Sequence, residues 1–163
     1  MNWMKKVAVA LVCLLPLGLQ AAKVDTLQVK SPSMNKSIEV VVVSPDVAAT
    51  KACPVIYLLH GYGGNARTWV GIKPDLSKIA DEKGIFFVCP DGKNTWYWDS
   101  PLNADVRYET FISDELVKYV DSHYKTVADR KGRAITGLSM GGHGAMWNGL
   151  RHSDVFSARS EER

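Results

Sequence analysis

Apolar residues occur along the chain in short continuous runs, separated by segments in which apolar positions repeat at helical spacing. Continuous runs are typical of strands buried on both faces of a sheet, and a repeat near 3.6 residues is typical of helices. The runs cover residues 54–59, 84–89 and 133–136, and the helical segments cover residues 75–83, 105–123 and 144–150. Their alternation predicts an α/β fold with a mostly parallel sheet and helices on both faces.

Two further strands precede these elements, at residues 26–30 and 37–43. The segment between them, residues 31–36, contains Pro, Ser and Asn, which favour tight turns. We therefore predict an antiparallel hairpin, which lies at one edge of the sheet.

The first 21 residues have a different pattern. Lys5 and Lys6 precede an apolar run from residue 7 to residue 19, and Gln20, Ala21 and Ala22 follow. This order is typical of a secretory signal peptide, and the apolar run is shorter than most membrane-spanning helices. We predict a signal peptide at residues 1–21, export to the periplasm or the cell exterior, and no other membrane contact. An uncleaved membrane anchor is the alternative.

Charge and cysteine content restrict the function further. The formal net charge is +3, and the two lysines of the predicted signal peptide leave +1 for residues 22–163. Such a balance predicts no nucleic-acid partner, and it does not define an oligomeric state. Cys53 opens one predicted strand and Cys89 closes the next, so both are expected to be free, buried thiols. No Cys or His spacing fits a metal site.

The clearest chemical motif is Gly137-Leu138-Ser139-Met140-Gly141, which follows a predicted strand and opens a helix. In that context the motif makes a sharp, strained turn that exposes the serine hydroxyl at the end of the sheet. Gly137 and Gly141 are expected where a Cβ atom would clash with neighbouring elements. We predict that Ser139 is a nucleophile and that the helix N-terminus favours negative charge developing there.

A second motif follows the predicted strand at residues 54–59, and its sequence is His60-Gly61-Tyr62-Gly63-Gly64. Acyl transfer builds negative charge on an oxygen, and a backbone N–H group aimed at that oxygen stabilises it by about 3 kcal/mol. We predict that the amides of Tyr62 and Met140 are two such donors. Gly61 and Gly63 would let the backbone approach the substrate.

Histidine is the usual general base for a serine nucleophile. His60 is expected to hold its loop by hydrogen bonds rather than to act as the base. His143 lies one helical turn after Ser139, on a helix that runs back beneath it, and is poorly placed for that role. His123 and His152 are expected at the surface near helix ends.

Trp96, Tyr97 and Trp98 lie on a loop after the predicted strand at residues 84–89. Loops at this end of a parallel sheet line the ligand crevice, so this loop could hold an aryl or sugar-like group of a substrate. The alternative is a hydrophobic cover over the core. The sequence leaves both interpretations open.

Several of these segments together resemble the esterase D-like branch of the α/β-hydrolases. That branch contains S-formylglutathione hydrolases, tributyrin-type esterases, feruloyl and acetyl-xylan esterases, and bacterial mycolyltransferases. The likeness covers about residues 25–156, and its motifs are Tyr57-Leu58-Leu59-His60-Gly61-Tyr62-Gly63-Gly64, Pro90-Asp91-Gly92, Trp96-Tyr97-x-Asp99-Ser100 and Thr136-Gly137-Leu138-Ser139-Met140-Gly141-Gly142.

The resemblance implies that residues 22–163 belong to one α/β-hydrolase domain with a Ser-Asp-His triad and no cofactor. It implies hydrolysis of short acyl, feruloyl, acetyl or related esters, on a small molecule or a carbohydrate, through an acyl-enzyme on Ser139. In this family the acid and then the base follow the serine. Here 24 residues follow Ser139, with Asp154 among them and no histidine after it.

We therefore expect residues 22–163 to form the N-terminal portion of the domain, with the C-terminal part and the triad Asp and His absent. Residues 157–163 are polar and predict no further strand, so the strand before Ser139 is expected at a sheet edge. Esterase activity would then be impaired. Two other interpretations are a non-catalytic remnant or binding domain, and an acyltransferase or S-formylglutathione-type thioesterase.

Overall fold

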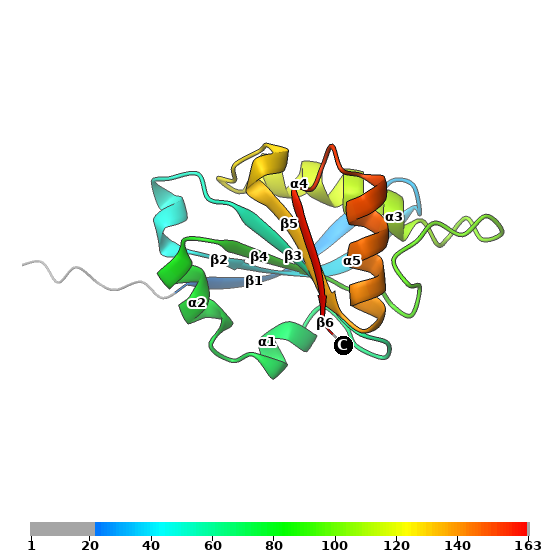
Figure 1. Ribbon diagram of the computed structural model, residues 1–163, viewed down its shortest axis with the longest axis horizontal. Helices are drawn as coiled ribbons and strands as arrows, with labels where there is room; N and C mark the ends of the chain where they lie inside the picture. The colour runs from blue at the N-terminus through cyan, green and yellow to red at the C-terminus, as the bar shows by residue number, and fades with distance from the viewer. Residues whose placement is uncertain (1–21, 163) are drawn as a thin grey trace, which may run out of the picture.

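A computed structural model describes residues 22–162, so the predicted signal peptide at residues 1–21 lies outside the described residues (Figure 1). The described chain forms one six-stranded sheet in the order β1-β2-β4-β3-β5-β6. The strands are β1 (Lys23–Ser31), β2 (Lys36–Ser44), β3 (Val55–Leu59), β4 (Phe86–Pro90), β5 (Arg133–Leu138) and β6 (Ala158–Glu162).

Pairing within the sheet confirms the predicted architecture. The hairpin β1-β2 is antiparallel and lies at one edge, and β2 also pairs antiparallel with β4. The remaining neighbours β4, β3, β5 and β6 are parallel. A mostly parallel sheet with an antiparallel N-terminal hairpin is therefore correct.

Helical segments connect the strands. They are η1 (Asp46–Ala49), α1 (Thr68–Ile72), α2 (Leu76–Lys83), α3 (Tyr108–Thr110), η2 (Phe111–Glu115), α4 (Leu116–His123), η3 (Arg130–Gly132) and α5 (Met140–Arg151). The predicted helix over residues 105–123 begins at Tyr108 and contains a π-helical segment, η2. No helix within residues 22–162 is long and apolar enough to cross a membrane.

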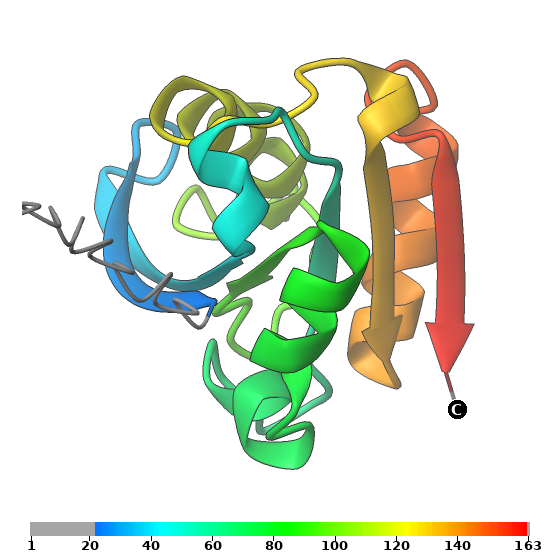
Figure 2. The same cartoon turned by 90° about the vertical axis from the view of Figure 1, so that its left-hand side faces the viewer.

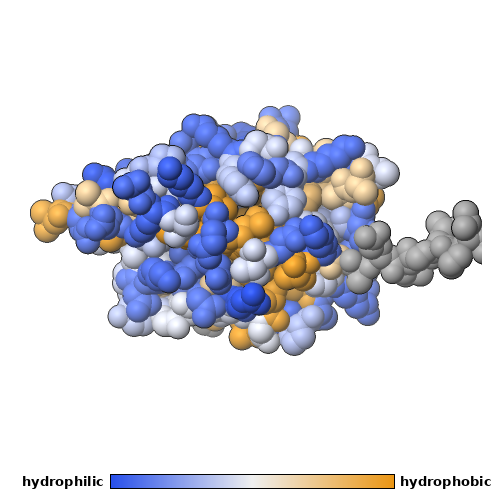
Figure 3. Space-filling model, turned by 180° about the vertical axis from the view of Figure 1, so that it is seen from behind, coloured by the Kyte–Doolittle hydropathy of each residue, from blue (hydrophilic) through white to orange (hydrophobic). Residues whose placement is uncertain are grey.

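The two faces of the sheet pack against different helices. Val40 and Tyr57 point to one face, which is covered by η2, α4 and α5. Val41 and Leu58 point to the other face, which is covered mainly by α2, with α1 beside it (Figure 1). Seen from behind, the surface is largely hydrophilic, with separated apolar patches (Figure 3).

The end of the chain corrects one expectation. The prediction of no strand after Ser139 is wrong, because β6 pairs in parallel with β5, from Ala134–Ala158 to Leu138–Glu162 (Figure 2). The strand that leads to Ser139 is therefore internal, and β6 is the edge. Ladder hydrogen bonds come from backbone groups, so a polar segment can pair wherever its neighbour leaves those groups free. Charged residues are also common on edge strands.

Both cysteines of the described chain follow the prediction. Cys53 and Cys89 are free and buried. Burial raises the pKa of the Cys89 thiol to about 12, so this side chain stays protonated and behaves as a small apolar residue.

Glu109 joins α3 to α5. Its carboxylate, 10% exposed, accepts hydrogen bonds from Trp147 Nε1 at 2.6 Å, Arg151 Nε at 2.7 Å and His152 Nε2 at 2.9 Å. Burial would raise the pKa of Glu109, but the hydrogen bonds from Arg151, Trp147 and His152 outweigh it and lower the pKa. His152, expected at the surface, is instead the half-buried partner of a carboxylate.

Tyr97 ties the loop after β4 to α5 and to the end of β3. It is fully buried, and its hydroxyl donates a hydrogen bond to the His60 carbonyl oxygen over 3.1 Å. Its ring fills a slot between two glycines, because a Cβ atom would lie 2.0 Å from the ring on Gly92 and 2.5 Å from it on Gly144. The sequence left two interpretations open for the loop that contains Trp96, Tyr97 and Trp98. For Tyr97 the second is correct, because its side chain covers the core.

We expect Gly144→Ala to destabilise the fold by about 1–3 kcal/mol, because the added methyl group overlaps the Tyr97 ring. Gly71→Ala is the matched control, since it lies in α1 with no atom within 4 Å of the new methyl group, and it should be neutral or slightly stabilising. Urea unfolding followed by tryptophan fluorescence measures both variants. Equal effects of the two substitutions on the free energy of unfolding would contradict the claim that the Tyr97 ring leaves no room for a side chain at Gly144.

We expect Glu109→Gln to lower the free energy of unfolding at pH 7 by about 1–3 kcal/mol, because three donors lose a charged acceptor that is itself largely buried. The folded-state pKa of Glu109 lies below its unfolded value of about 4.3, so the charge stabilises the fold above that pH. The difference between the variant and the unaltered chain should therefore shrink as the pH falls below about 4. Glu82→Gln, at an exposed ion pair with Lys78, should change little at any pH.

Candidate active site

The carboxyl ends of β4, β3 and β5 lie side by side at one end of the sheet. The loop from Asp91 follows β4, the glycine-rich loop from His60 follows β3, and Ser139 follows β5. Ligands of open α/β sheets bind in the crevice outside these strand ends. The sheet topology therefore brings the two main sequence motifs together.

Ser139 occupies a strained turn between β5 and α5. It is exposed, and its φ of 54° and ψ of −113° are rare for a residue with a side chain. The flanking glycines explain how the turn closes. A Cβ atom on Gly137 would lie 2.3 Å from the Gly141 carbonyl carbon, and one on Gly141 would lie 2.2 Å from the Leu59 carbonyl oxygen.

The loop after β3 lies directly against this turn. A Cβ atom on Gly61 would lie 3.6 Å from Ser139 Cβ. The next residue, Tyr62, is 67% exposed, and its amide donates no hydrogen bond to another protein group within residues 22–162. Gly63 has a left-handed φ of 78°, and its amide donates to Asn94 Oδ1 at 2.8 Å. The loop is thus held by side chains of the neighbouring loop.

Met140 is the first residue of α5 and is buried. The first N–H groups of an α-helix have no partner within the helix, and the helix dipole adds partial positive charge at this end. The Met140 amide thus has no acceptor within α5, and the Tyr62 amide lies on the loop that packs against the Ser139 turn.

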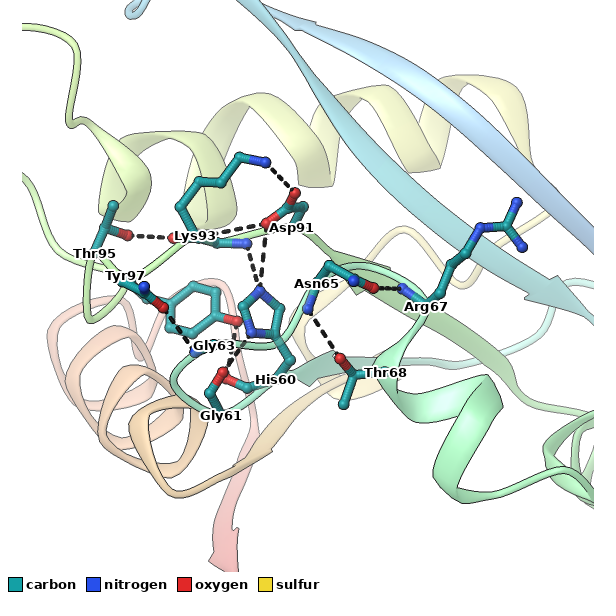
Figure 4. A network of polar contacts seen from close by, with 12 residues as sticks. His60, Gly61, Gly63, Asn65, Arg67, Thr68, Asp91, Lys93, Thr95 and Tyr97 are labelled. Atoms are coloured by element: carbon teal, nitrogen blue, oxygen red, sulfur yellow. Dashed lines mark hydrogen bonds and ion pairs between the residues drawn. The ribbon is translucent and has the colours of Figure 1, made fainter.

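His60 is buried at the junction of the loops after β3 and β4 (Figure 4). Its Nδ1 lies 2.7 Å from the Gly61 carbonyl oxygen, which can only accept, so Nδ1 carries a proton and donates. Its Nε2 accepts from the Gly92 amide at 3.0 Å. Both ring nitrogens are engaged with backbone groups, which confirms that His60 holds the loop and has no free nitrogen to act as a base.

Asp91 supports this junction, although the sequence drew attention to it only within the motif Pro90-Asp91-Gly92. Its carboxylate accepts from the Lys93 amide at 2.9 Å and Lys93 Nζ at 2.6 Å, and it lies 3.5 Å from His60 Nε2. Burial would raise the pKa of Asp91, but the ammonium and amide of Lys93 outweigh it and hold the pKa well below its usual range. Asp91 is therefore ionised at neutral pH.

A row of aromatic side chains borders the site along α5. Trp96 meets the His143 ring edge-on, His143 stacks on Trp147, and Trp147 meets Trp98 edge-on, with ring centroids 5.4, 6.1 and 6.4 Å apart. Trp96 and Trp98 are 45% and 43% exposed, unlike the buried Tyr97 between them. Trp147 was not among the residues predicted from the sequence to line the site. Its position four residues after His143 places the two on one helix face and was the available signal.

The remaining histidines contribute elsewhere. His143 Nδ1 contacts the Trp96 carbonyl oxygen at 3.2 Å. His123 is exposed near the end of α4, as predicted, and its ring stacks on Tyr119. Among the described residues no cluster of His, Cys, Asp or Glu could hold a metal ion. The polar groups at the strand ends are thus a serine, two free amides and a network that fixes the loops.

Comparison with known proteins gives this arrangement a family. The family model described as "Putative esterase" matches residues 31–160. Over 140 residues the chain is 30% identical to an esterase of Mycobacterium tuberculosis, covering 82% of this chain and 30% of that protein. Over 102 residues it is 31% identical to an acetyl esterase of Caldicellulosiruptor saccharolyticus, covering 62% of this chain and 37% of that enzyme.

Solved structures extend the likeness to the fold. A ferulic acid esterase superposes with a TM-score of 0.72 at 32% identity, covering 85% of this chain and 60% of that one. An S-formylglutathione hydrolase from Agrobacterium tumefaciens gives a TM-score of 0.74 at 25% identity, covering 85% of this chain and 57% of that one. The chain spans less than two thirds of the length of each of these relatives. Because the family model matches residues 31–160, the chain belongs to this esterase family, and the superpositions show that it has an α/β-hydrolase-type fold.

Proposed function

We propose that this chain provides the nucleophile and the oxyanion-binding amides of a serine carboxylic-ester hydrolase. The observation that carries the proposal is the turn at Ser139, whose left-handed backbone and flanking glycines bring the residue against the loop after β3. Strained backbone conformations persist where packing holds them, and they are concentrated at functional sites. Membership of the esterase family supports the same chemistry.

In the proposed reaction, Ser139 Oγ attacks the ester carbonyl carbon while its proton passes to a base. The electron pair of the C=O bond moves to oxygen, and the amides of Tyr62 and Met140 donate to the resulting oxyanion. The C–O bond to the alcohol then breaks, the alcohol leaves with the proton, and an acyl-enzyme remains on Ser139. Water hydrolyses this ester and restores the free serine.

Residues 22–162 place no side-chain base in hydrogen-bond contact with Ser139 Oγ. In this described part of the chain, none of the four histidine rings makes a hydrogen bond to Ser139, and the bond between His143 and Ser139 joins only their backbone groups. Serine is a weak nucleophile without a base, since its hydroxyl is barely ionised at neutral pH. We therefore propose that the 163-residue chain reacts slowly, through binding and the oxyanion donors, which retain about 10³-fold catalysis over water in triad enzymes that lack the base.

The proposed substrates are esters of short or aromatic acids, on a small molecule or a carbohydrate. The exposed rings of Trp96 and Trp98 support an aryl or sugar group near the site. Related proteins named ferulic acid esterase and acetyl esterase support the same range. We also propose that the protein is exported, on the basis of the basic, apolar and small-residue pattern of residues 1–21.

The same contacts of the histidines favour a second candidate, a non-catalytic binding domain. Its Ser139 would sit in the same turn but would not react, because no base activates it. A reagent that captures reactive serines covalently distinguishes the two candidates.

We expect a fluorophosphonate probe, in a long incubation, to form one adduct on Ser139 of the 163-residue chain, because the turn and the two amides favour attack even without a base. Mass spectrometry of the digested protein locates the adduct. Ser139→Ala should abolish it, and Ser153→Ala, at an exposed serine after α5, should not. No adduct on the folded chain, or an unchanged adduct in Ser139→Ala, would favour the binding domain.

A further inference from the structure

A polar cavity lies at the same end of the sheet as Ser139, but beside the hairpin β1-β2 and the loop after β4 instead of β5. Its volume is about 480 Å³. Neighbouring strands lie about 4.8 Å apart, and β3 separates β4 from β5, so the cavity is roughly 10–15 Å from Ser139. The side chains that decide its chemistry are Lys36, Glu39, Arg67, Asp91, Lys93 and Tyr108.

Two of the cations that line this cavity have no carboxylate partner. Lys36 Nζ donates to the Asp105 carbonyl oxygen at 2.6 Å, and Arg67 Nη2 donates to Thr26 Oγ1 at 3.0 Å. Both acceptors are neutral, and within residues 22–162 neither cation is in an ion pair. The cavity thus keeps two positive charges that no acidic group compensates directly.

The remaining charges do not cancel this excess. Asp91 and Lys93 pair with each other at 2.6 Å, so together they contribute no net charge. Glu39 adds one negative charge to the lining. Against Lys36 and Arg67, the balance is one net positive charge, which favours a negatively charged ligand.

Tyr108 supplies an unused donor at the same place. It is 1% exposed, and its buried hydroxyl makes no hydrogen bond to a protein group in the described part of the chain. Burial and, to a lesser extent, the charge of Asp91 raise the pKa of Tyr108 to about 12, so the hydroxyl stays protonated at neutral pH. Lys36 Nζ lies 5.1 Å from the centroid of the Tyr108 ring, so the two groups are close neighbours. Buried polar groups are nearly always paired, which makes this hydroxyl a candidate for a ligand contact.

We propose that this cavity binds a carboxylate, held by Lys36, Arg67 and the Tyr108 hydroxyl. If the proposed function holds, this carboxylate is part of the ester substrate. It then lies about 10–15 Å from the scissile bond. The substrate class is then esters that carry a negative charge remote from the acyl group transferred to Ser139. Arg67 and Lys36 bind the charge, and Tyr108 adds a directed hydrogen bond.

Binding of D-glucuronate and D-glucose to the 163-residue chain tests the charge requirement, because the two sugars differ only at C6, which is a carboxylate in glucuronate and a neutral hydroxymethyl group in glucose. We expect glucuronate to bind at low ionic strength in isothermal titration calorimetry, and glucose to bind at least tenfold more weakly. Equal binding of both sugars would overturn the assignment in favour of a neutral sugar site. No binding of either would also overturn it.

Variants locate the binding. Lys36→Gln and Arg67→Gln should each weaken glucuronate binding about tenfold, whereas Lys118→Gln, at an exposed pair with Asp114, should leave it unchanged. Tyr108→Phe should weaken binding without lowering the unfolding temperature of the free protein, because its hydroxyl has no protein partner to lose. Unchanged binding in all three cavity variants, or a destabilised free Tyr108→Phe protein, would contradict the proposal.

The readout is independent of the reaction at Ser139. Ser139→Ala should bind glucuronate as the unaltered chain does, since the cavity contains no part of the Ser139 turn. Failed labelling with retained glucuronate binding would therefore refute the nucleophile alone, and labelling without glucuronate binding would refute the cavity alone.

Discussion

The close approach of two backbone segments at Gly141 is the constraint on which the site depends. A side chain at this position would collide with the Leu59 carbonyl oxygen, so only glycine lets the first turn of α5 pack against the end of β3. That packing brings Ser139 beside the loop that carries Tyr62. It also leaves Ser139 with a φ of 54°, a conformation that costs on the order of 1–3 kcal/mol. The contacts of α5 with β5 and β3 offset this cost.

Two buried side chains, His60 and Tyr97, then fix the loops around that contact. His60 uses its ring nitrogens on the backbone of Gly61 and Gly92, and Tyr97 donates to the His60 carbonyl oxygen. The loops after β3 and β4 are thus held together by directed hydrogen bonds. Such a network keeps the Tyr62 amide at a set distance from the nucleophile turn, which is what oxyanion binding requires. It also prevents His60 from acting as a base.

Most of the fold could be predicted from the sequence, because the buried strands and amphipathic helices have strong patterns. β6 could not, since its polar residues pair through backbone groups that β5 leaves free, and no side-chain pattern reports such pairing. Adjacent residues of one motif also differ in burial, which the sequence did not predict. Trp96 and Tyr97 both adopt a φ of 58°, which breaks any regular alternation, and only Tyr97 is buried.

The candidate site was predictable to the extent that it lies within local motifs. The turn at Ser139 and the loop from His60 both follow buried strands, and parallel pairing brings them together. Contacts between distant segments had no local signal. The bond of His152 to Glu109 spans 43 residues, and the cavity beside Tyr108 depends on how the hairpin β1-β2 packs against later loops.

The central claim is that Ser139 and the amides of Tyr62 and Met140 form one preorganised site. A crystal structure of the fluorophosphonate adduct tests it most directly, because the phosphonyl oxygen stands in for the oxyanion of the ester reaction. We expect this oxygen to lie about 2.7–3.1 Å from both amide nitrogens, with the loop from His60 unmoved. A phosphonyl oxygen directed into solvent, or bound by other groups, would contradict it.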